Sequence, residues 1–265
     1  MLTVKGLSKT FNPGSVNQRL ALENVSLHLD KGEFVTIIGG NGAGKSTLFG
    51  AIGGSFFPDR GRVVLDGEDI TFRPEHKRSA GIGRLFQDPL RGTAPTMTIE
   101  ENLALAYLRS SRQTMRLAAV GSKERAYFKE RLALLDMGLE DRLKAKVGLL
   151  SGGQRQALTL LMATLVTPKL LLLDEHTAAL DPATAEKVLA LTRRIVAQEG
   201  ITCLMITHNI GSALELGSRT IMMDNGRIVL DLSGQQRKDM TVPALLTLFK
   251  QQSNKDFDND RMLLG

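Results

Sequence analysis

The spacing of apolar residues along the first third of the chain is typical of strands. Apolar residues in ALENVSLHLD (residues 21–30) alternate with polar ones, and EFVTIIGG (33–40) is an almost continuous apolar run, so both are predicted to be strands. The stretch GRVVLDGEDI (61–70) is predicted to be a hairpin that turns at Asp66–Gly67. GIGRLFQ (81–87) is predicted to be a further strand.

The pattern changes to helical spacing from about residue 98 to residue 167, where Leu, Ala and Arg dominate. IEENLALAYLRS (99–110) and ERAYFKERLALLDMGL (124–139) carry apolar residues three and four positions apart. A helical subdomain inserted between strands is therefore expected. STLFGAIGG (46–54) in the first third is also predicted to be a helix, closed by its last two glycines.

Strand patterns return with KLLLLDE (169–175), a fully apolar run suited to a parallel central strand. A helix is predicted over 181–200, with Asp181 as its cap, Pro182 at its first position, Gly200 at its end and one apolar face made by Val188, Leu191 and Ile195. The remaining predictions are a strand at 201–208, a hairpin around Asn225–Gly226, a helix at 242–252 and a frayed tail at 253–260.

Composition narrows the class of protein. The 265 residues are 42% hydrophobic and 23% charged, contain a single cysteine, and include no apolar run long enough to span a membrane. No apolar segment follows Lys5 and Lys9, so a signal peptide is not expected, and the protein is expected to be cytoplasmic. The net charge of +6 fits a solvated basic surface; with two tyrosines, no tryptophan and no arginine stripe, nucleic acid is a weaker expectation.

The stretch GGNGAGKS, Gly39 to Ser46, fills every fixed position of the phosphate-loop pattern G-x-x-x-x-G-K-[ST]. Glycines between a strand and a helix let several backbone N–H groups converge on one anion. The helix start adds its positive end, Lys45 would reach the β- and γ-phosphates, and the Ser46 hydroxyl would ligate Mg²⁺. The alternative is a glycine-rich turn with a chance lysine, and the flanking strand and helix argue against it.

Two further clusters extend the phosphate chemistry. Asp174 and Glu175 end a buried strand, where Asp174 would hold Mg²⁺ through water and Glu175 would deprotonate the attacking water; the alternative is two carboxylates that merely meet solvent. Ser151, Gly152 and Gly153 open a helix and form a second candidate anion site, or simply a capped helix entry. The chain would hold one nucleotide but has two helix starts that can bind phosphate. This predicts a head-to-tail dimer, in which the second helix start closes over the γ-phosphate held by the other chain.

In chain order, these motifs resemble those of ABC-type ATPases; the segments that carry the resemblance are 39–47, Gln87, 150–154, 170–175, 179–181 and His208. The resemblance implies an α/β fold: a P-loop NTPase core of the ABC ATPase type, with an N-terminal antiparallel β subdomain and an inserted α-helical subdomain. We expect the ATPase domain at 1–232, its helical subdomain at about 88–165, and a short C-terminal helix and tail at 233–265.

The resemblance also implies roles for single residues. Gln87 would contact Mg²⁺ and the attacking water, His208 would bond the γ-phosphate, and Asp181 would lie at the dimer interface. Phe11 is placed either to stack on adenine or as a core phenylalanine. The full set expected to bind ATP is Phe11, Gly39, Asn41, Gly42, Ala43, Gly44, Lys45, Ser46, Thr47, Gln87, Ser151, Gly152, Gly153, Gln154, Asp181 and His208.

Three positions depart from the family pattern. Ala157 stands where an arginine is common, and Ala178 stands where a serine usually begins the loop before Asp181. His176 follows the expected base directly, and a structural role in the loop is favoured over a third phosphate contact. None of these changes removes an expected catalytic group.

Three kinds of ABC protein are compatible with the motifs: an importer subunit, a subunit of an exporter or lipid-extraction system, and a soluble ATPase acting on nucleic acid or ribosomes. The third is disfavoured by the single phosphate loop and by the absence of a heptad run or zinc-ligand set between Lys45 and Ser151. The stretches 148–165 and 170–182 look like those of a bacterial importer group found beside permeases and lipoprotein-type binding proteins. This resemblance implies a homodimer at the cytoplasmic face of the inner membrane, a permease that docks a short helix on residues 88–103, and a substrate-binding protein. The expected substrates are amino acids or related small molecules.

Overall fold

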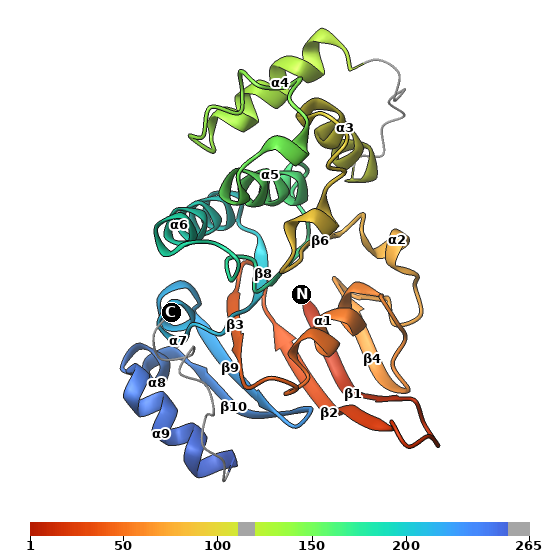
Figure 1. The fold of residues 1–265 in the computed structure, drawn as a ribbon. Coiled ribbons are helices and arrows are strands. Elements are labelled where there is room, and N and C mark those ends of the chain that lie inside the picture. The colour runs from red at the N-terminus through yellow and green to blue at the C-terminus, as the bar shows by residue number, and fades with distance from the viewer. Residues whose placement is uncertain (111–119, 254–265) are drawn as a thin grey trace. The chain divides into compact units, whose positions relative to one another are not determined.

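The computed structural model describes residues 1–110 and 120–253, and the chain forms two compact units (Figure 1). The first unit contains residues 1–78 and the chain from Thr202 onward, and the second contains residues 79–201. Most of the tail predicted at 253–260 lies outside the described residues. No helix in the described parts of the chain combines the length and apolar character needed to cross a membrane.

One sheet of the first unit is antiparallel, with strand order β2-β1-β4-β5. Its strands are β1 (Leu2–Phe11), β2 (Arg19–Leu29), β4 (Arg60–Leu65) and β5 (Glu68–Asp69). Asp66 and Gly67 both have positive φ, 55° and 81°, which is the backbone that a two-residue hairpin turn requires. The predicted hairpin at 61–70 is therefore confirmed.

The other strands of the first unit surround β3 (Phe34–Ile38), which runs parallel to β8 (Thr202–Ile206) on one side and to β9 (Arg219–Asp224) on the other. β10 (Arg227–Ser233) returns antiparallel to β9 through Asn225–Gly226, as predicted. Every residue of β3 and β8 is buried, which explains their continuous apolar sequences.

The helices of the first unit are α1 (Lys45–Gly53), α2 (Glu75–Arg78), α7 (Ile210–Leu216), α8 (Gly234–Lys238) and α9 (Val242–Ser253). The predicted C-terminal helix is confirmed as α9. Its Leu245 and Phe249 join a buried cluster with Ile210 of α7 and Met222 of β9. This packing attaches the C-terminal helices to the strands that surround β3 (Figure 1).

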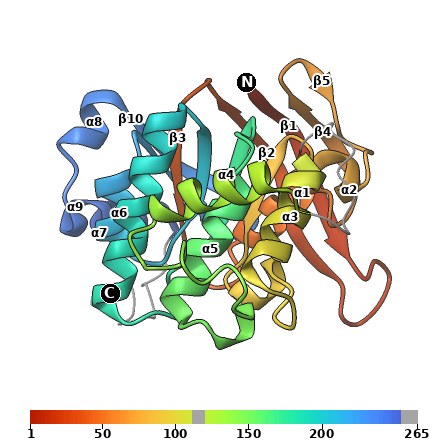
Figure 2. The ribbon, with the colours of Figure 1, turned by 90° about the horizontal axis from the view of Figure 1, so that it is seen from above.

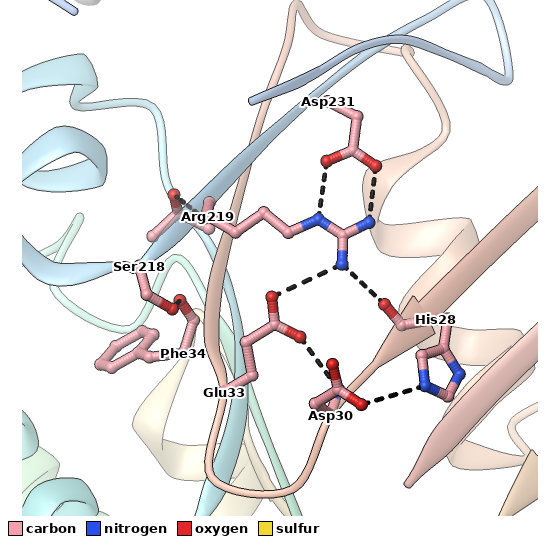
Figure 3. A network of polar contacts seen from close by, with 8 residues as sticks. His28, Asp30, Glu33, Phe34, Ser218, Arg219 and Asp231 are labelled. Atoms are coloured by element: carbon pink, nitrogen blue, oxygen red, sulfur yellow. Dashed lines mark hydrogen bonds and ion pairs between the residues drawn. The ribbon is translucent and has the colours of Figure 1, made fainter. Parts of the chain in front are cut away.

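Arg219, a half-buried residue of β9, links four segments of the first unit (Figure 3). The Arg219 guanidinium donates two hydrogen bonds of 2.6 Å to the Asp231 carboxylate and one of 2.7 Å to the His28 carbonyl. The same group lies 3.5 Å from Glu33, whose other oxygen accepts the Asp30 N–H at 2.9 Å. Arg219 therefore fixes the entry to β3 against the β9–β10 ribbon.

The second unit combines a parallel strand pair with helices. β6 (Ile82–Leu85) pairs with β7 (Leu170–Asp174), and the helices are α3 (Ile99–Ser110), α4 (Ser122–Ala133), α5 (Gly152–Thr164) and α6 (Pro182–Glu199), with short 3-10 turns at Pro89–Gly92 and Val147–Leu149. α3, α4 and α5 contact one another and lie side by side (Figure 2). The predicted helical character after residue 98 is confirmed, but the helix predicted over 124–139 ends at Ala133, and Asp136 and Gly138 beyond it have positive φ.

Candidate nucleotide and catalytic site

The loop between β3 and α1 has the backbone that its glycines were predicted to supply. Gly39 and Gly44 have φ values of 149° and 101°, outside the range that residues with side chains ordinarily adopt. A Cβ on Gly39 would lie 2.2 Å from the Met223 carbonyl oxygen, and one on Gly44 would lie 2.7 Å from the Ala21 carbonyl oxygen. Both positions thus require glycine for conformation and for close approach.

Lys45, the first residue of α1, turns its ammonium group back onto the loop. Its Nζ donates to the Gly39 carbonyl at 2.8 Å and to the Gly40 carbonyl at 3.0 Å, and the residue is buried. The first N–H groups of α1 have no acceptor within the helix, and Ser46 is exposed in this first turn. A cation, helix N–H groups and a hydroxyl therefore share one short segment, which is the chemistry that binds a polyphosphate.

Two residues that the motif did not reveal hold this loop in place. Arg19 donates to the Gly42 carbonyl at 3.0 Å, and the Gly226 N–H donates to the Ala43 carbonyl at 2.9 Å. Both come from hairpin regions far from the loop in sequence, so no local pattern could have identified them.

His208 lies at the same sheet edge as the phosphate loop. β3 and β8 are parallel and in register, with Ile37 opposite Ile206, and the Thr207 N–H donates to the Ile37 carbonyl at 3.2 Å. Gly39 and His208 therefore both follow the carboxyl ends of neighbouring strands, where ligands of open α/β sheets bind. The Asn209 side chain caps α7 at 2.8 Å and fixes the chain immediately after His208.

Phe11, at the end of β1, makes the kind of contact expected if it is a core phenylalanine. Its ring meets Phe56 edge-to-face with centroids 5.2 Å apart, and the Lys9 ammonium lies 5.7 Å from its centre. The ring is partly exposed, so adenine stacking stays a prediction.

In the second unit, Asp174 is the last residue of β7 and Glu175 follows it in the left-handed region, with φ 46°. The loop then turns through hydrogen bonds from Ala178 N–H to the Glu175 carbonyl and from Leu180 N–H to the Thr177 carbonyl. Asp181 ends the loop and caps α6 by accepting the Thr184 N–H at 3.0 Å. Hydrogen bonds from Thr184 lower the pKa of Asp181, so this cap is anionic at neutral pH.

Ser151 caps α5 in a reciprocal arrangement with Gln154. The Ser151 hydroxyl accepts the Gln154 N–H at 3.2 Å, and the Gln154 side chain accepts the Ser151 N–H at 3.3 Å. This is a capping box, a specific form of the capped helix entry left open by the sequence. Ser151 and Gly152 are exposed, so the helix start is accessible to a ligand.

The glycines after Ser151 have a packing role that the sequence did not reveal. A Cβ on Gly153 would lie 2.3 Å from Cγ2 of Thr184, and one on Gly152 would lie 3.3 Å from Cδ2 of Leu180. Small residues at the start of α5 thus let the start of α6 approach. The structure thereby brings the start of α5 at Ser151 and the loop that ends at Asp181 together within one unit.

Gln87 is exposed and follows β6. The preceding Phe86 ring has guanidinium groups against it, with the Arg84 carbon 4.6 Å and the Arg91 carbon 5.0 Å from its centre. These three residues line a cavity of about 300 Å³ together with Asn102, Leu105, Arg109, Thr159 and Met162. Part of the segment 88–103 lines the cavity, and among the described residues none of those that line it is acidic.

The predicted metal donors Ser46, Gln87 and Asp174 offer a hydroxyl, an amide oxygen and a carboxylate. Mg²⁺ prefers oxygen donors and keeps waters and substrate phosphates among its ligands. Within residues 1–110 and 120–253 there is no cluster of three or more His, Cys, Asp or Glu that would form an all-protein cage. The donor chemistry fits Mg²⁺ brought in with a nucleotide.

The departures from the family pattern lie in the second unit. Ala157 is fully buried in α5, and Ala178 donates its backbone N–H within the turn after Glu175. His176 is 2% exposed, and burial lowers its pKa to about 4, so its ring is neutral. A buried ring of this kind supports the structural role that was favoured for it.

Comparison with known proteins gives consistent matches over most of the chain. The ABC transporter family matches residues 22–178. A tyrosine transport ATP-binding protein of Clostridioides difficile is 43% identical over 94% of this chain and 99% of that protein. The xylose/arabinose import ATP-binding protein XylG of Sulfolobus acidocaldarius is 35% identical over 94% of each. The dimeric ATP-binding cassette MJ0796, in a post-hydrolysis state bound to ADP and Pi, matches with a TM-score of 0.76 and 31% identity, covering 88% of this chain and 98% of that one.

Proposed function

Because the chain belongs to the ABC transporter family, we propose that it binds and hydrolyses ATP to drive import of a small molecule through a membrane permease. The observation that carries the proposal is the loop 39–47, where glycines adopt positive φ and the buried Lys45 turns its ammonium group onto the loop, as binding of phosphates requires. The xylose/arabinose import relative favours an importer over an exporter or a soluble ATPase.

In the proposed reaction the loop binds the phosphates of ATP. Lys45 exchanges its hydrogen bonds to the Gly39 and Gly40 carbonyls for phosphate oxygens, and the first N–H groups of α1 donate to the same anion. Ser46, Gln87 and Asp174 would hold Mg²⁺, which would supply positive charge to the phosphates of the bound nucleotide. His208 donates to the γ-phosphate.

Glu175 is the proposed general base. It orients a water molecule for attack on the γ-phosphorus and accepts the proton, while the bond to the β-γ bridging oxygen breaks and ADP leaves. A positioned base of this kind contributes about 10²- to 10⁴-fold in rate. Gln87 contacts the same water and reports the state of the nucleotide to the helices that follow it.

Replacing Glu175 by Gln tests this assignment. Glu175→Gln keeps the size and hydrogen-bonding capacity of the side chain but cannot accept the proton at neutral pH. Steady-state ATP hydrolysis is expected to fall by at least about 10²-fold, while ATP binding is retained and an ATP-dependent dimer accumulates. Unchanged hydrolysis in this variant would remove Glu175 from the role of base. Glu186→Gln, on an exposed position of α6, is the matched control.

The working unit is proposed to be a head-to-tail homodimer that encloses two ATP molecules. The exposed start of α5 at Ser151 would bind the γ-phosphate held by the loop 39–47 of the partner subunit. Asp181, on the adjoining loop, would lie at the same interface. The dimeric MJ0796 cassette supports dimerisation, because it is a related chain of similar fold.

The permease is proposed to dock at the cavity beside Phe86. Arg84, Arg91 and Arg109 surround a partly apolar hollow that includes Leu105, so a short helix with an apolar residue and a carboxylate would complement it. In this proposal the chain is a peripheral subunit on the cytoplasmic face of the membrane. A substrate-binding protein is the proposed third component.

Cysteine crosslinking tests the docking site directly. Cys203 is buried, so a cysteine introduced at Leu105 is the accessible thiol. Leu105→Cys should crosslink to a co-expressed permease bearing cysteines along its cytoplasmic loops. Lys187→Cys, on an exposed position of α6 outside the cavity lining, is the matched control. Efficient crosslinking at residue 187 but not at 105 would contradict the proposal.

An amino acid is the proposed substrate class, because the tyrosine transport relative is more similar to this chain than the sugar-import relative. The chain itself does not contact the substrate. Uptake of labelled tyrosine and of labelled xylose by cells with and without the gene would test the class. Gene-dependent uptake of xylose alone would contradict it.

A further inference from the structure

His176 is a buried imidazole that the proposed reaction does not use. It follows Glu175 directly, and its Nε2 lies 3.2 Å from Oγ1 of Thr192 on α6. Thr192 Oγ1 donates its single hydrogen to the Val188 carbonyl at 2.8 Å. The threonine can therefore only accept from the imidazole, so Nε2 carries the hydrogen and His176 is the donor.

Two contacts attach the loop to α6, and they lie far apart along the helix. Asp181 attaches the loop to the first turn of this helix, whereas Thr192 lies well inside it. The loop 175–181 is thus attached to α6 at two separate places, once through the Asp181 cap and once through His176. Two attachments restrict both position and rotation of the intervening backbone, which one attachment does not.

The backbone at Glu175 needs such a restraint. A glutamate with φ 46° is in the left-handed region, which is unfavourable for a non-glycine residue and persists only where the surroundings hold it. His176 is the next residue, and its side chain is anchored in the interior of the unit. The anchor therefore acts on the peptide that sets where the Glu175 carboxylate points.

We propose that His176 is a positioning residue: its hydrogen bond to Thr192 fixes the backbone of Glu175 and so aims the carboxylate at the attacking water. This inference rests on the proposed role of Glu175 as base. His176 touches neither nucleotide nor water in this mechanism.

Removing either partner of the bond tests the proposal. His176→Leu and Thr192→Val should each lower kcat for ATP about 10-fold or more, because a small misplacement of a catalytic group can cost up to 10²-fold. The KM for ATP should change little, since the loop 39–47 is untouched. The double variant should be no slower than the slower single variant, because both changes break the same bond.

Two further variants separate positioning from folding. His176→Gln places an amide N–H as many bonds from Cβ as Nε2, so it should restore most of kcat. Thr164→Val removes a hydroxyl that is equally buried and that donates to the Leu160 carbonyl at 2.8 Å, but Thr164 lies on α5 away from this loop. It should keep normal kcat. All variants are assayed well below their own melting temperatures.

The outcomes are distinct. Normal kcat in folded Thr192→Val and His176→Leu, with Glu175→Gln inactive, would overturn the positioning role and leave the base intact. An equal loss in Thr164→Val and Thr192→Val would overturn it as well, because a general packing effect would then explain both. Activity retained in Glu175→Gln would instead remove the base, and with it the premise.

Discussion

Arg78 is the residue that holds the far end of the phosphate-loop helix. Its buried guanidinium donates to the Ala51 and Ile52 carbonyls, at 2.7 and 2.8 Å, which are among the last carbonyls of α1 and have no partner within the helix. It also donates to the Thr71 and Arg73 carbonyls at 2.7 Å. A cation at the carboxyl end of a helix is favourable to the helix dipole as well.

Arg78→Met should therefore destabilise the fold. Four carbonyls would lose their donor, three of them in buried hydrogen bonds, and a loss of about 3 kcal/mol in the free energy of unfolding is expected from urea denaturation. Arg78→Lys should recover only part of it, because an ammonium group cannot reproduce the planar fork. Arg73→Met is the control: its bridge to Glu68 is exposed and should contribute at most about 1 kcal/mol. Equal stability of Arg78→Met and Arg73→Met would contradict this account.

Glu100 gives the second unit a pH-dependent contribution to stability. Its carboxylate is buried and pairs with Arg125 at 2.8 Å and with Lys144 at 2.9 Å. The hydrogen bond from Arg125 is the main reason that the pKa of Glu100 is lowered from its ordinary value of 4.5, against the opposing effect of burial. A carboxyl with a lowered pKa stabilises the folded state above pH 4.5, and the stabilisation is lost as pH falls through the folded pKa.

Glu100→Gln should thus cost stability at pH 7, by about 1–3 kcal/mol, and cost progressively less as the pH is lowered below 4.5. Chemical denaturation at several pH values measures this convergence. Glu130→Gln, on an exposed position of α4, should show no such convergence. A penalty for Glu100→Gln that is the same at pH 7 and at the acid end would show that the charge is not the source of the stability.

At the scale of single residues, the sequence predicts those whose partners lie close to them along the chain. Asp181 could be predicted as a cap because the next residue is proline and a helical pattern follows. Arg78 and Glu100 could not, because their partners are separated from them by up to 27 and 44 positions along the chain, and a single charged residue in a sequence carries no sign of being buried. Only the assembled fold shows which charges have partners.

At the scale of elements, helices and strands could largely be predicted from apolar spacing and turn residues. The hairpins at Asp66–Gly67 and Asn225–Gly226 and the helices at 182–199 and 242–253 follow these signals. The short α2, α7 and α8 were not predicted, because four to seven residues are too few to show a helical period. The sequence could not predict which residues of neighbouring helices pack against each other, as the close approach of Gly153 to Thr184 illustrates.

Gly153→Ala should weaken the packing of α5 against α6. The added methyl group would lie 2.3 Å from Thr184 Cγ2, and overpacking of this kind costs about 1–3 kcal/mol. Gly152→Ala, where the nearest atom is 3.3 Å away, should cost less. Adding Thr184→Ser removes the opposing methyl group, so it should recover most of the stability of Gly153→Ala. If Gly153→Ala melts at the wild-type temperature, the close approach of the two helices is wrong.

At the scale of the whole molecule, the phosphate loop and His208 belong to the first unit, and Gln87, Ser151, Asp174, Glu175 and Asp181 belong to the second. The order of these motifs along the chain is what identified them, and each lies at the end of the element predicted for it. The proposed dimer adds a requirement that no single chain meets: Ser151 acts on a nucleotide held by the partner subunit.

Crosslinking between different chains tests that requirement. Asn41 and Ser151 are exposed, and the natural Cys203 is buried. A cysteine that replaces either exposed residue is therefore the accessible thiol of its chain. In a background of Glu175→Gln, a mixture of Asn41→Cys and Ser151→Cys chains treated with ATP and a short bifunctional maleimide should give a covalent dimer. Neither chain alone should give it, because a head-to-tail arrangement places residue 41 of one chain opposite residue 151 of the other. A dimer formed equally well by Asn41→Cys alone would require a head-to-head contact instead, and Ser151 would then have no nucleotide to bind.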